Sequence, residues 1–265
     1  MEQPTRTIDK DTARKRFLSH LLIAIPAFNE EDSLRKLLPS IREVFPGVPV
    51  AVINDGSHDA TVFVAQASEV IVLNSPHNMG VGGAMQLAYE YALRHHFRAV
   101  LRLDSDGQHP PSEAMKLIDC HLDTHADLVV GSRFGETKEC VSSGARYLGI
   151  HGLAWFMSLI CRTKVSDPTS GFWLVSGTLV NYFAHEYPMD YPEPEAISLS
   201  RRLGYSYAEV PVLFQPRIAG KSSIGAFDTV YYIVKVGMAL LVDRVRSLNK
   251  RYMKTHARRH EEGSK

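Results

Sequence analysis

The sequence of 265 residues has few of the features that mark disulfide-stabilised, secreted or membrane-spanning proteins. Its three cysteines, at positions 120, 140 and 161, form no CxxC pair, which favours a reducing compartment over a disulfide framework. No apolar run reaches the about 18 residues of a membrane-spanning helix, and the polar N-terminus lacks a signal-peptide core. The histidines show no zinc-site spacing, and a net charge of +1 gives no overall attraction to nucleic acid. We therefore expect an ordinary globular, cytoplasmic protein.

The sequence does contain an alternation of short apolar runs and helical patterns. Five runs predict strands: Leu21–Ile25, Val50–Ile53, Val70–Leu73, Ala99–Leu103 and Leu128–Val130. The first of them is a continuous apolar run, which is typical of a strand buried on both faces. Helical patterns fall between the five runs, which predicts an α/β fold with a mostly parallel, Rossmann-like sheet flanked by helices. The second half is less regular: we expect a helix over 145–159, a loop over 166–171, a proline-rich link over 187–194, a helix ending near 203, a strand over 205–210 and a long helix after 225.

Four predicted strands end in polar motifs: Pro26–Glu30, Asn54–Ser57, Asn78–Gly83 and Asp104–Gln108. Open parallel sheets bind ligands at the carboxyl ends of their strands, and each motif is followed by a predicted helix whose N-terminus favours an anion. Four such ends in the first 110 residues are hard to explain by turn chemistry alone.

Asp104 and Asp106 have the spacing that puts two side chains on the same side of an extended chain. Together with Gln108 they offer hard oxygen ligands, which suit Mg²⁺ or Mn²⁺ shared with a diphosphate. The alternative is a solvated, aspartate-rich turn.

The glycines of Gly80–Gly83 resemble half of a dinucleotide-binding fingerprint, with Asp104 at about the distance of the ribose-binding acid. They follow the third predicted strand instead of the first, however, and the last glycine of the fingerprint is missing. We therefore interpret them as positions where the backbone approaches a ligand or a neighbouring helix closely.

Seven motifs occur in a characteristic order: IPAFNEE from Ile25, INDGSHDAT from Ile53, NMGVGGAMQLA from Asn78, LDSDGQHPPS from Leu103, VGSRF from Val130, DPTSGF from Asp167 and AEVPVLFQPRIAGKSSIG from Ala208. In this order they resemble the inverting glycosyltransferases of family 2, and most of all the dolichyl- and polyprenyl-phosphate sugar synthases. The resemblance implies a GT-A domain over residues 21–225 that binds a nucleotide-diphospho-sugar and Mg²⁺ or Mn²⁺. A basic segment, 1–20, would precede it, and an amphipathic, basic helical extension, 226–265, would follow.

The resemblance also implies a role for each matching residue. The contacts to the nucleotide-sugar would come from Pro26, Ala27, Asn29, Glu30, Asp55, Gly80, Asp104, Arg217 and Lys221. The metal would be held by Asp104, Asp106 and Gln108, with Asp106 and Gln108 as the direct ligands. Arg133 would meet an acceptor phosphate, and Arg217 and Lys221 would belong to a loop that closes over the diphosphate. Asp55 could alternatively cap the next helix. Asn54 stands where relatives usually have aspartate, so the resemblance does not identify the nucleobase of the donor.

The catalytic base is less clearly indicated. Many relatives carry a Glu-Asp pair before a helix that ends in Gly-Tyr. Counting back from Gly204 and Tyr205, the corresponding positions here are Pro192 and Glu193. Glu193 is therefore one candidate base, and Asp167 is a second, although it could also be an ordinary turn residue before proline. Trp173, where relatives often have a basic residue, could stack on a sugar or pack in the core.

The acceptor divides the functional hypotheses. A lipid phosphate arrives ionised and needs positioning by Arg133, whereas a sugar hydroxyl of a growing glycan needs a general base such as Glu193. We favour transfer to a polyprenyl phosphate; a sugar nucleotidyltransferase and a non-catalytic sugar-binding relative are the remaining alternatives. The apolar segment 230–242 and the basic residues after it predict peripheral contact with the inner face of the membrane. Its alternatives are packing on the domain and a homodimer contact.

Overall fold

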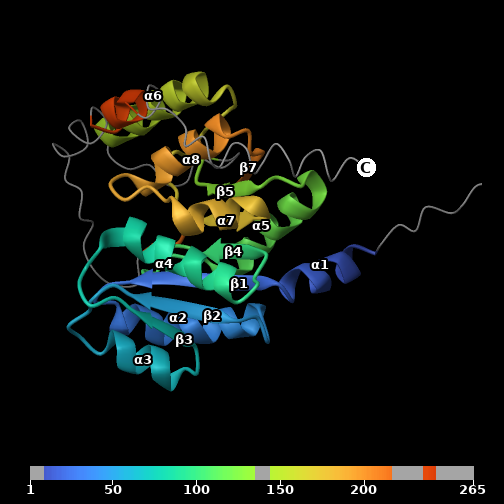
Figure 1. Cartoon of the computed structure of the whole chain (residues 1–265), viewed down its shortest axis with the longest axis vertical. Helices are drawn as coiled ribbons and strands as arrows, with labels where there is room; N and C mark the ends of the chain where they lie inside the picture. Colours follow the sequence, from blue (N-terminus) through green and yellow to red (C-terminus); the bar gives the residue numbers. More distant parts are fainter. Residues whose placement is uncertain (1–8, 135–143, 217–234, 243–265) are drawn as a thin grey trace, which may run out of the picture.

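The computed structural model describes residues 9–134, 144–216 and 235–242. Within these ranges the chain forms one sheet of seven strands in the order β3-β2-β1-β4-β6-β5-β7 (Figure 1). In chain order the strands are β1 (Leu21–Ala27), β2 (Val50–Asn54), β3 (Ile71–Asn74), β4 (Ala99–Arg102), β5 (Leu128–Ser132), β6 (Trp173–Ser176) and β7 (Tyr207–Pro211). β6 is antiparallel to β4 and β5, and the other neighbouring strands are parallel. The expected mostly parallel sheet is confirmed, with one reversed strand.

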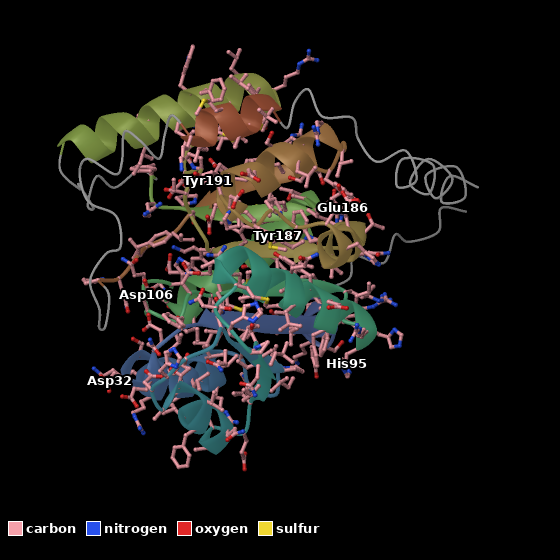
Figure 2. All side chains as sticks on the ribbon, turned by 60° about the vertical axis from the view of Figure 1, so that its left-hand side comes forward. Asp32, His95, Asp106, Glu186, Tyr187 and Tyr191 are labelled. Carbon is pink, nitrogen blue, oxygen red and sulfur yellow. The ribbon has the colours of Figure 1, made fainter. Side chains whose placement is uncertain are left out.

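Helices cover both faces of this sheet. They are α1 (Lys10–Leu18), α2 (Glu31–Val44), α3 (Thr61–Ala67), α4 (Gly80–Arg94), α5 (Pro111–Thr124), α6 (Gly144–Cys161), α7 (Thr178–His185) and α8 (Pro192–Arg202), and residues 235–242 are also helical. Side chains of α2, α3 and α5 share one buried cluster with the sheet. Those of α4, α6, α7, α8 and the stretch 235–242 share the other. Figures 1 and 2 show α6 and the stretch 235–242 side by side, beyond α8.

β1 shows why a continuous apolar run predicts a strand that is covered on both sides. All seven residues of β1 are buried between β2 and β4. Leu22 and Ala24 belong to the cluster on the α4 side, and Ile23 and Ile25 belong to the cluster on the α2 side. A strand in this position needs a continuous apolar run instead of an alternating one, which is why β1, β2 and β4 could be predicted.

The second half of the chain differs from expectation in three places. β6 and α7 were not predicted, although β6 is as long and as buried as β4. α8 begins at Pro192, inside the expected link, since proline fits the first turn of a helix. Of the long helix expected after Gly225, only the stretch 235–242 falls within the described residues.

The N-terminal and C-terminal parts of the chain both contact the domain. Arg14 on α1 forms an ion pair of 2.8 Å with Asp119 on α5. Val236 and Leu240 are buried in the cluster that contains Leu153 of α6. Across the described ranges, no helix combines the length and the hydropathy that crossing a bilayer would require.

Gly82 explains part of the glycine-rich motif at the start of α4. A Cβ at this position would lie 2.6 Å from Met189 Cα and 2.6 Å from the Pro188 carbonyl oxygen. The absent side chain therefore lets α4 pack directly on the backbone of the 188–189 loop. The close approach is to a loop, whereas the sequence-based interpretation named a ligand or a neighbouring helix.

We predict that Gly82→Ala lowers the free energy of unfolding by about 1–3 kcal/mol, because the added methyl group overpacks the contact with residues 188–189. Chemical denaturation measures the change. Gly152→Ala is the matched control, because Gly152 lies exposed on α6 with open space around its Cβ position. It should be neutral or stabilise by up to about 1 kcal/mol. Equal stabilities of Gly82→Ala and the unchanged protein would contradict the packing argument.

Candidate active site

The motifs after β1 and β2 meet at the carboxyl edge of the sheet. The Asp55 N–H donates to the Ala27 carbonyl oxygen at 2.9 Å, and the His58 N–H donates to Asn29 Oδ1 at 2.8 Å. Asn29 adopts a positive φ of 55°, which turns the chain back toward this neighbouring loop. The Glu30 N–H donates to Thr61 Oγ1, at the start of α3. The candidate residues of Pro26–Glu30 therefore lie beside those of Asn54–Ser57.

Asp55 joins a third motif to these two. Its carboxylate accepts the N–H groups of Met79 and Gly80 at 2.7 and 2.8 Å, so it binds the N-terminus of α4. The expected alternative, a cap on the next helix, is wrong, because Asp59 supplies that contact by accepting the Thr61 N–H at the start of α3. Gly80 has a φ of 75°, a conformation that favours glycine.

The candidate metal ligands lie in the tight loop between β4 and α5. The Gln108 N–H donates to Asp106 Oδ1 at 3.0 Å, across the turn made by Gly107 at a φ of 77°. Asp106 is nearly buried, whereas the Asp104 side chain is 32% exposed. Two carboxylates and an amide form an all-oxygen set, which fits Mg²⁺ or Mn²⁺.

His109 holds this loop from inside the core. Its Nδ1 accepts the Asp104 N–H at 2.9 Å, and its ring stacks on Phe172 with 4.7 Å between the ring centroids. Burial lowers the pKa of His109 to about 4, so the ring is neutral at physiological pH and can accept that hydrogen bond. His109 therefore fixes the backbone from which Asp104 projects.

Arg133 and Asp167 form a closely bonded pair after β5. Asp167 Oδ2 accepts the Arg133 backbone N–H at 3.0 Å and Nε at 2.8 Å, while Oδ1 accepts NH2 at 2.8 Å. Asp167 is fully buried, and the Arg133 side chain is 25% exposed. Glu209 on β7 accepts the Ser166 N–H at 2.9 Å and so holds the same loop from the other side. Both Asp167 oxygens are therefore engaged in orienting Arg133.

Glu193, the other candidate base, is also ion-paired. It lies in the first turn of α8, and its Oε1 is 2.9 Å from Arg102 NH1. Arg102, in turn, contacts Asp104 Oδ1 at 3.0 Å. Tertiary structure thus brings Glu193 next to the candidate metal ligands. Arg102 was missed because it was counted within an apolar run, although a charged residue in a buried strand is itself a signal.

Two further expectations concern neighbouring residues. Trp173 is fully buried on β6, so of the two alternatives it packs in the core.

Arg217 and Lys221 lie outside the described residues. The chain that leads to them crosses the metal loop, because the Gln215 N–H donates to the Gln108 carbonyl oxygen at 3.0 Å.

Comparison with known proteins identifies the family. Residues 22–176 match the family model described as glycosyl transferase family 2. The chain belongs to this family. It is therefore a glycosyltransferase, which sets aside the dinucleotide-binding and nucleotidyltransferase alternatives.

Two relatives of this glycosyltransferase match along most of its length. It is 25% identical over 252 residues to polyprenol monophosphomannose synthase of Mycolicibacterium smegmatis, covering 90% of this chain and 95% of the relative. It is 27% identical over 239 residues to undecaprenyl-phosphate mannosyltransferase of Micrococcus luteus, covering 83% and 94%.

A solved structure supports the fold. Glucosyl-3-phosphoglycerate synthase from Mycobacterium tuberculosis, crystallised with Mn²⁺, uridine diphosphate and glucosyl-3-phosphoglycerate, superposes with a TM-score of 0.62 at 24% identity. The match covers 92% of this chain and 86% of that one. The expected GT-A fold is confirmed.

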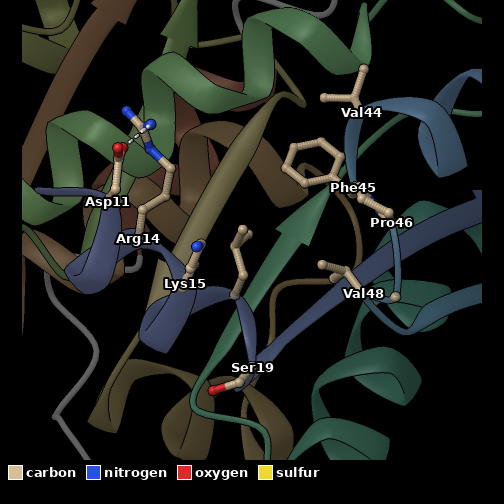
Figure 3. A pocket seen from close by; sticks show the side chains of 10 residues that line it. Asp11, Arg14, Lys15, Ser19, Val44, Phe45, Pro46 and Val48 are labelled. Carbon is tan, nitrogen blue, oxygen red and sulfur yellow. Dashed lines mark hydrogen bonds and ion pairs between the residues drawn. The ribbon is translucent and has the colours of Figure 1, made fainter.

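A hollow shown in Figure 3 lies away from these residues. It has a volume of about 570 Å³ between α1 and the loop after α2, with Arg14, Leu18, Phe45 and Val48 in its lining. Leu18 and Val48 precede β1 and β2, so this hollow is at the amino edge of the sheet. The glycosyltransferase motifs gather at the opposite, carboxyl edge.

The described residues contain no group of three or more His, Cys, Asp or Glu side chains arranged to hold a metal ion. Two aspartates and one amide are a small ligand set of the kind that Mg²⁺ completes with substrate phosphates. We predict that binding of uridine or guanosine diphosphate, measured by calorimetry with Mn²⁺, weakens at least tenfold in EDTA. Equal affinity in both conditions would contradict a metal role.

The same site predicts the effect of Asp106→Asn. Loss of one carboxylate charge should reduce turnover by about a hundredfold or more, the order seen when a main electrostatic element of catalysis is removed. Asp123→Asn is the matched control, because Asp123 is exposed on α5 and pairs with Lys10. It should retain turnover, measured by release of nucleoside diphosphate. Comparable losses in both variants would point to a general effect on folding.

Proposed function

We propose that this glycosyltransferase transfers a sugar, with inversion at the anomeric carbon, from a nucleotide-diphospho-sugar to a polyprenyl phosphate. Mg²⁺ or Mn²⁺ held by Asp104, Asp106 and Gln108 would neutralise charge on the departing nucleoside diphosphate. Two relatives named for polyprenyl-phosphate mannosyl transfer, matched over most of their length, support the acceptor class.

The observation that carries the choice of acceptor is that both candidate bases are ion-paired. Asp167 accepts three hydrogen bonds from Arg133, and Glu193 pairs with Arg102. Taking a proton from a sugar hydroxyl would remove the negative charge that either carboxylate presents to its arginine partner. A phosphate acceptor is already ionised and has no proton to lose, so this arrangement favours it over a hydroxyl.

In the proposed reaction an oxygen of the lipid phosphate attacks the anomeric carbon. The bond from that carbon to the donor diphosphate breaks, and the nucleoside diphosphate leaves with the electron pair. Arg133, oriented by Asp167 and lying 5.3 Å over the Phe214 ring, would position the acceptor phosphate. Asn29, Glu30 and Asp55 would line the nucleoside site, and Arg217 and Lys221 would contact the diphosphate.

The acceptor hypothesis predicts an order of mutant effects. With a short-chain polyprenyl phosphate, Glu193→Gln should lower turnover by no more than about tenfold, because no proton has to be removed. Arg133→Ala should lower it by at least about a hundredfold, because the acceptor dianion loses its partner. Steady-state assays with nucleotide sugars and Mn²⁺ measure both.

Arg133→Ala also leaves the buried Asp167 unpaired, so Arg133→Lys serves as a second variant that keeps a cation. Melting temperatures show whether each variant is folded. A loss of 10²–10⁴-fold for Glu193→Gln, with Arg133→Lys nearly active, would favour a glycan hydroxyl as acceptor.

We further propose that the enzyme is peripheral at the inner face of the membrane. The stretch 235–242 buries Val236 and Leu240 and exposes Met238, Leu241 and Val242. α6, beside it, exposes Trp155 and Leu159, and its sequence contains no acidic residue. Basic residues follow in the sequence at 244, 246, 250 and 251, which suits an anionic lipid surface.

This proposal predicts that Met238→Glu together with Leu241→Glu releases the protein from vesicles of phosphatidylglycerol and phosphatidylcholine, because charge on an inserting face opposes burial in lipid. Co-sedimentation at low salt measures binding. Phe63→Glu is the control, because Phe63 is 67% exposed on α3, far from α6 in Figure 1. A parent protein that ignores the vesicles at low salt would favour a packing or dimer role for this helix.

A further inference from the structure

Arg102 contacts the candidate site through Asp104, and its side chain is almost fully buried. It ends β4 in the interior of the sheet, where its partner across the antiparallel pair is Trp173, and its side chain is 3% exposed. Moving a guanidinium out of water costs several kcal/mol unless carboxylates accompany it. Such a residue is retained only where its charge is matched by partners.

The two partners come from different parts of the fold. Asp104 Oδ1 is 3.0 Å from both Nε and NH2, and Glu193 Oε1 is 2.9 Å from NH1. The planar fork of arginine can serve both carboxylates at once, which the single ammonium of lysine does less well. With one cation and two anions, this triad has a net charge of −1.

The guanidinium has little room to move. A Cβ at Gly171 would lie 2.5 Å from Arg102 NH2 and 2.9 Å from Asp104 Oδ2, so the backbone before β6 packs directly on the pair. The exposure of the triad is graded: Arg102 is almost fully buried, the Glu193 side chain is 16% exposed, and Asp104 is 32% exposed. Asp104, the end of the triad that belongs to the metal loop, is therefore the more accessible of the two carboxylates.

We propose that Arg102 is a positioning residue that presents Asp104 to the divalent cation, and that Glu193 acts through Arg102 instead of as a proton acceptor. The proposal rests on the metal-dependent transfer proposed above, but it holds for either acceptor. Partners that orient metal ligands in this way typically change metal affinity 10–100-fold when they are replaced.

The positioning role and simple charge attraction predict opposite changes in cation affinity when Arg102 is replaced. Arg102→Met changes the net charge of the triad from −1 to −2, which by attraction alone would bind a cation more tightly. If Arg102 positions Asp104, the same change weakens binding by about 10–100-fold. The direction of the change therefore separates the two roles.

The experiment is a titration of the full chain with Mn²⁺ in the presence of uridine or guanosine diphosphate, followed by the electron paramagnetic resonance signal of free Mn²⁺. Arg102→Met is compared with Arg102→Lys, which keeps the charge and is the safer variant for folding. Gly171→Ala crowds both the guanidinium and the Asp104 carboxylate without removing any charge, so it tests the geometry of the pair, and the two Arg102 variants isolate the part played by Arg102. We expect all three to bind Mn²⁺ about tenfold or more weakly, and Arg102→Met/Glu193→Gln, which restores a net charge of −1, to remain as weak as Arg102→Met.

Arg14→Lys is the matched control, because Arg14 also pairs with a carboxylate, Asp119, but on α1 and α5 away from the site. It should bind Mn²⁺ like the parent protein, and melting temperatures are recorded for every variant. Unchanged or tighter Mn²⁺ binding by folded Arg102→Lys and Arg102→Met, whatever their melting temperatures, would overturn the positioning role alone. No Mn²⁺ binding by the parent with either nucleotide would overturn the metal-dependent reaction as well.

Discussion

A charged guanidinium buried at the end of a central strand constrains the arrangement around the candidate site. Arg102 must have carboxylates beside it, because an unpaired buried charge would cost several kcal/mol. Asp104 follows on the same strand exit, but Glu193 has to be brought in from the N-terminus of α8. The reversed strand β6 and helix α7 make this possible, since they place the chain so that α8 begins next to β4.

The same physical solution recurs on the other side of the site. Asp167 is fully buried and paired with Arg133, and Glu209 holds the loop that carries it. In both places the groups are already oriented by the protein before a substrate arrives. Preorganised charges in a water-poor environment stabilise a developing charge more strongly than mobile ones, and such charge develops when a group is transferred away from a diphosphate.

Much of the fold could be predicted because it depends on patterns within short stretches of the sequence. β1, β2 and β4 are covered on both faces, so their apolar runs are continuous, and the polar motifs after them identify the carboxyl edge. β6 and α7 were not recognised, although β6 is as long and as buried as β4. Arg102 was overlooked because it was counted with its apolar neighbours, although an arginine within a buried strand already indicates a charge that needs partners.

The sequence by itself determined the family, the parallel sheet and the identity of the strand-end motifs, because these depend on residues that are close together in the chain. Only the tertiary structure decided which charges meet. It paired Glu193 with Arg102 and Asp167 with Arg133, and it moved the capping role of Asp55 from α3 to α4. Ion pairs between distant segments leave no periodicity in the sequence. The sequence does not show whether a carboxylate faces water, a cation or a substrate.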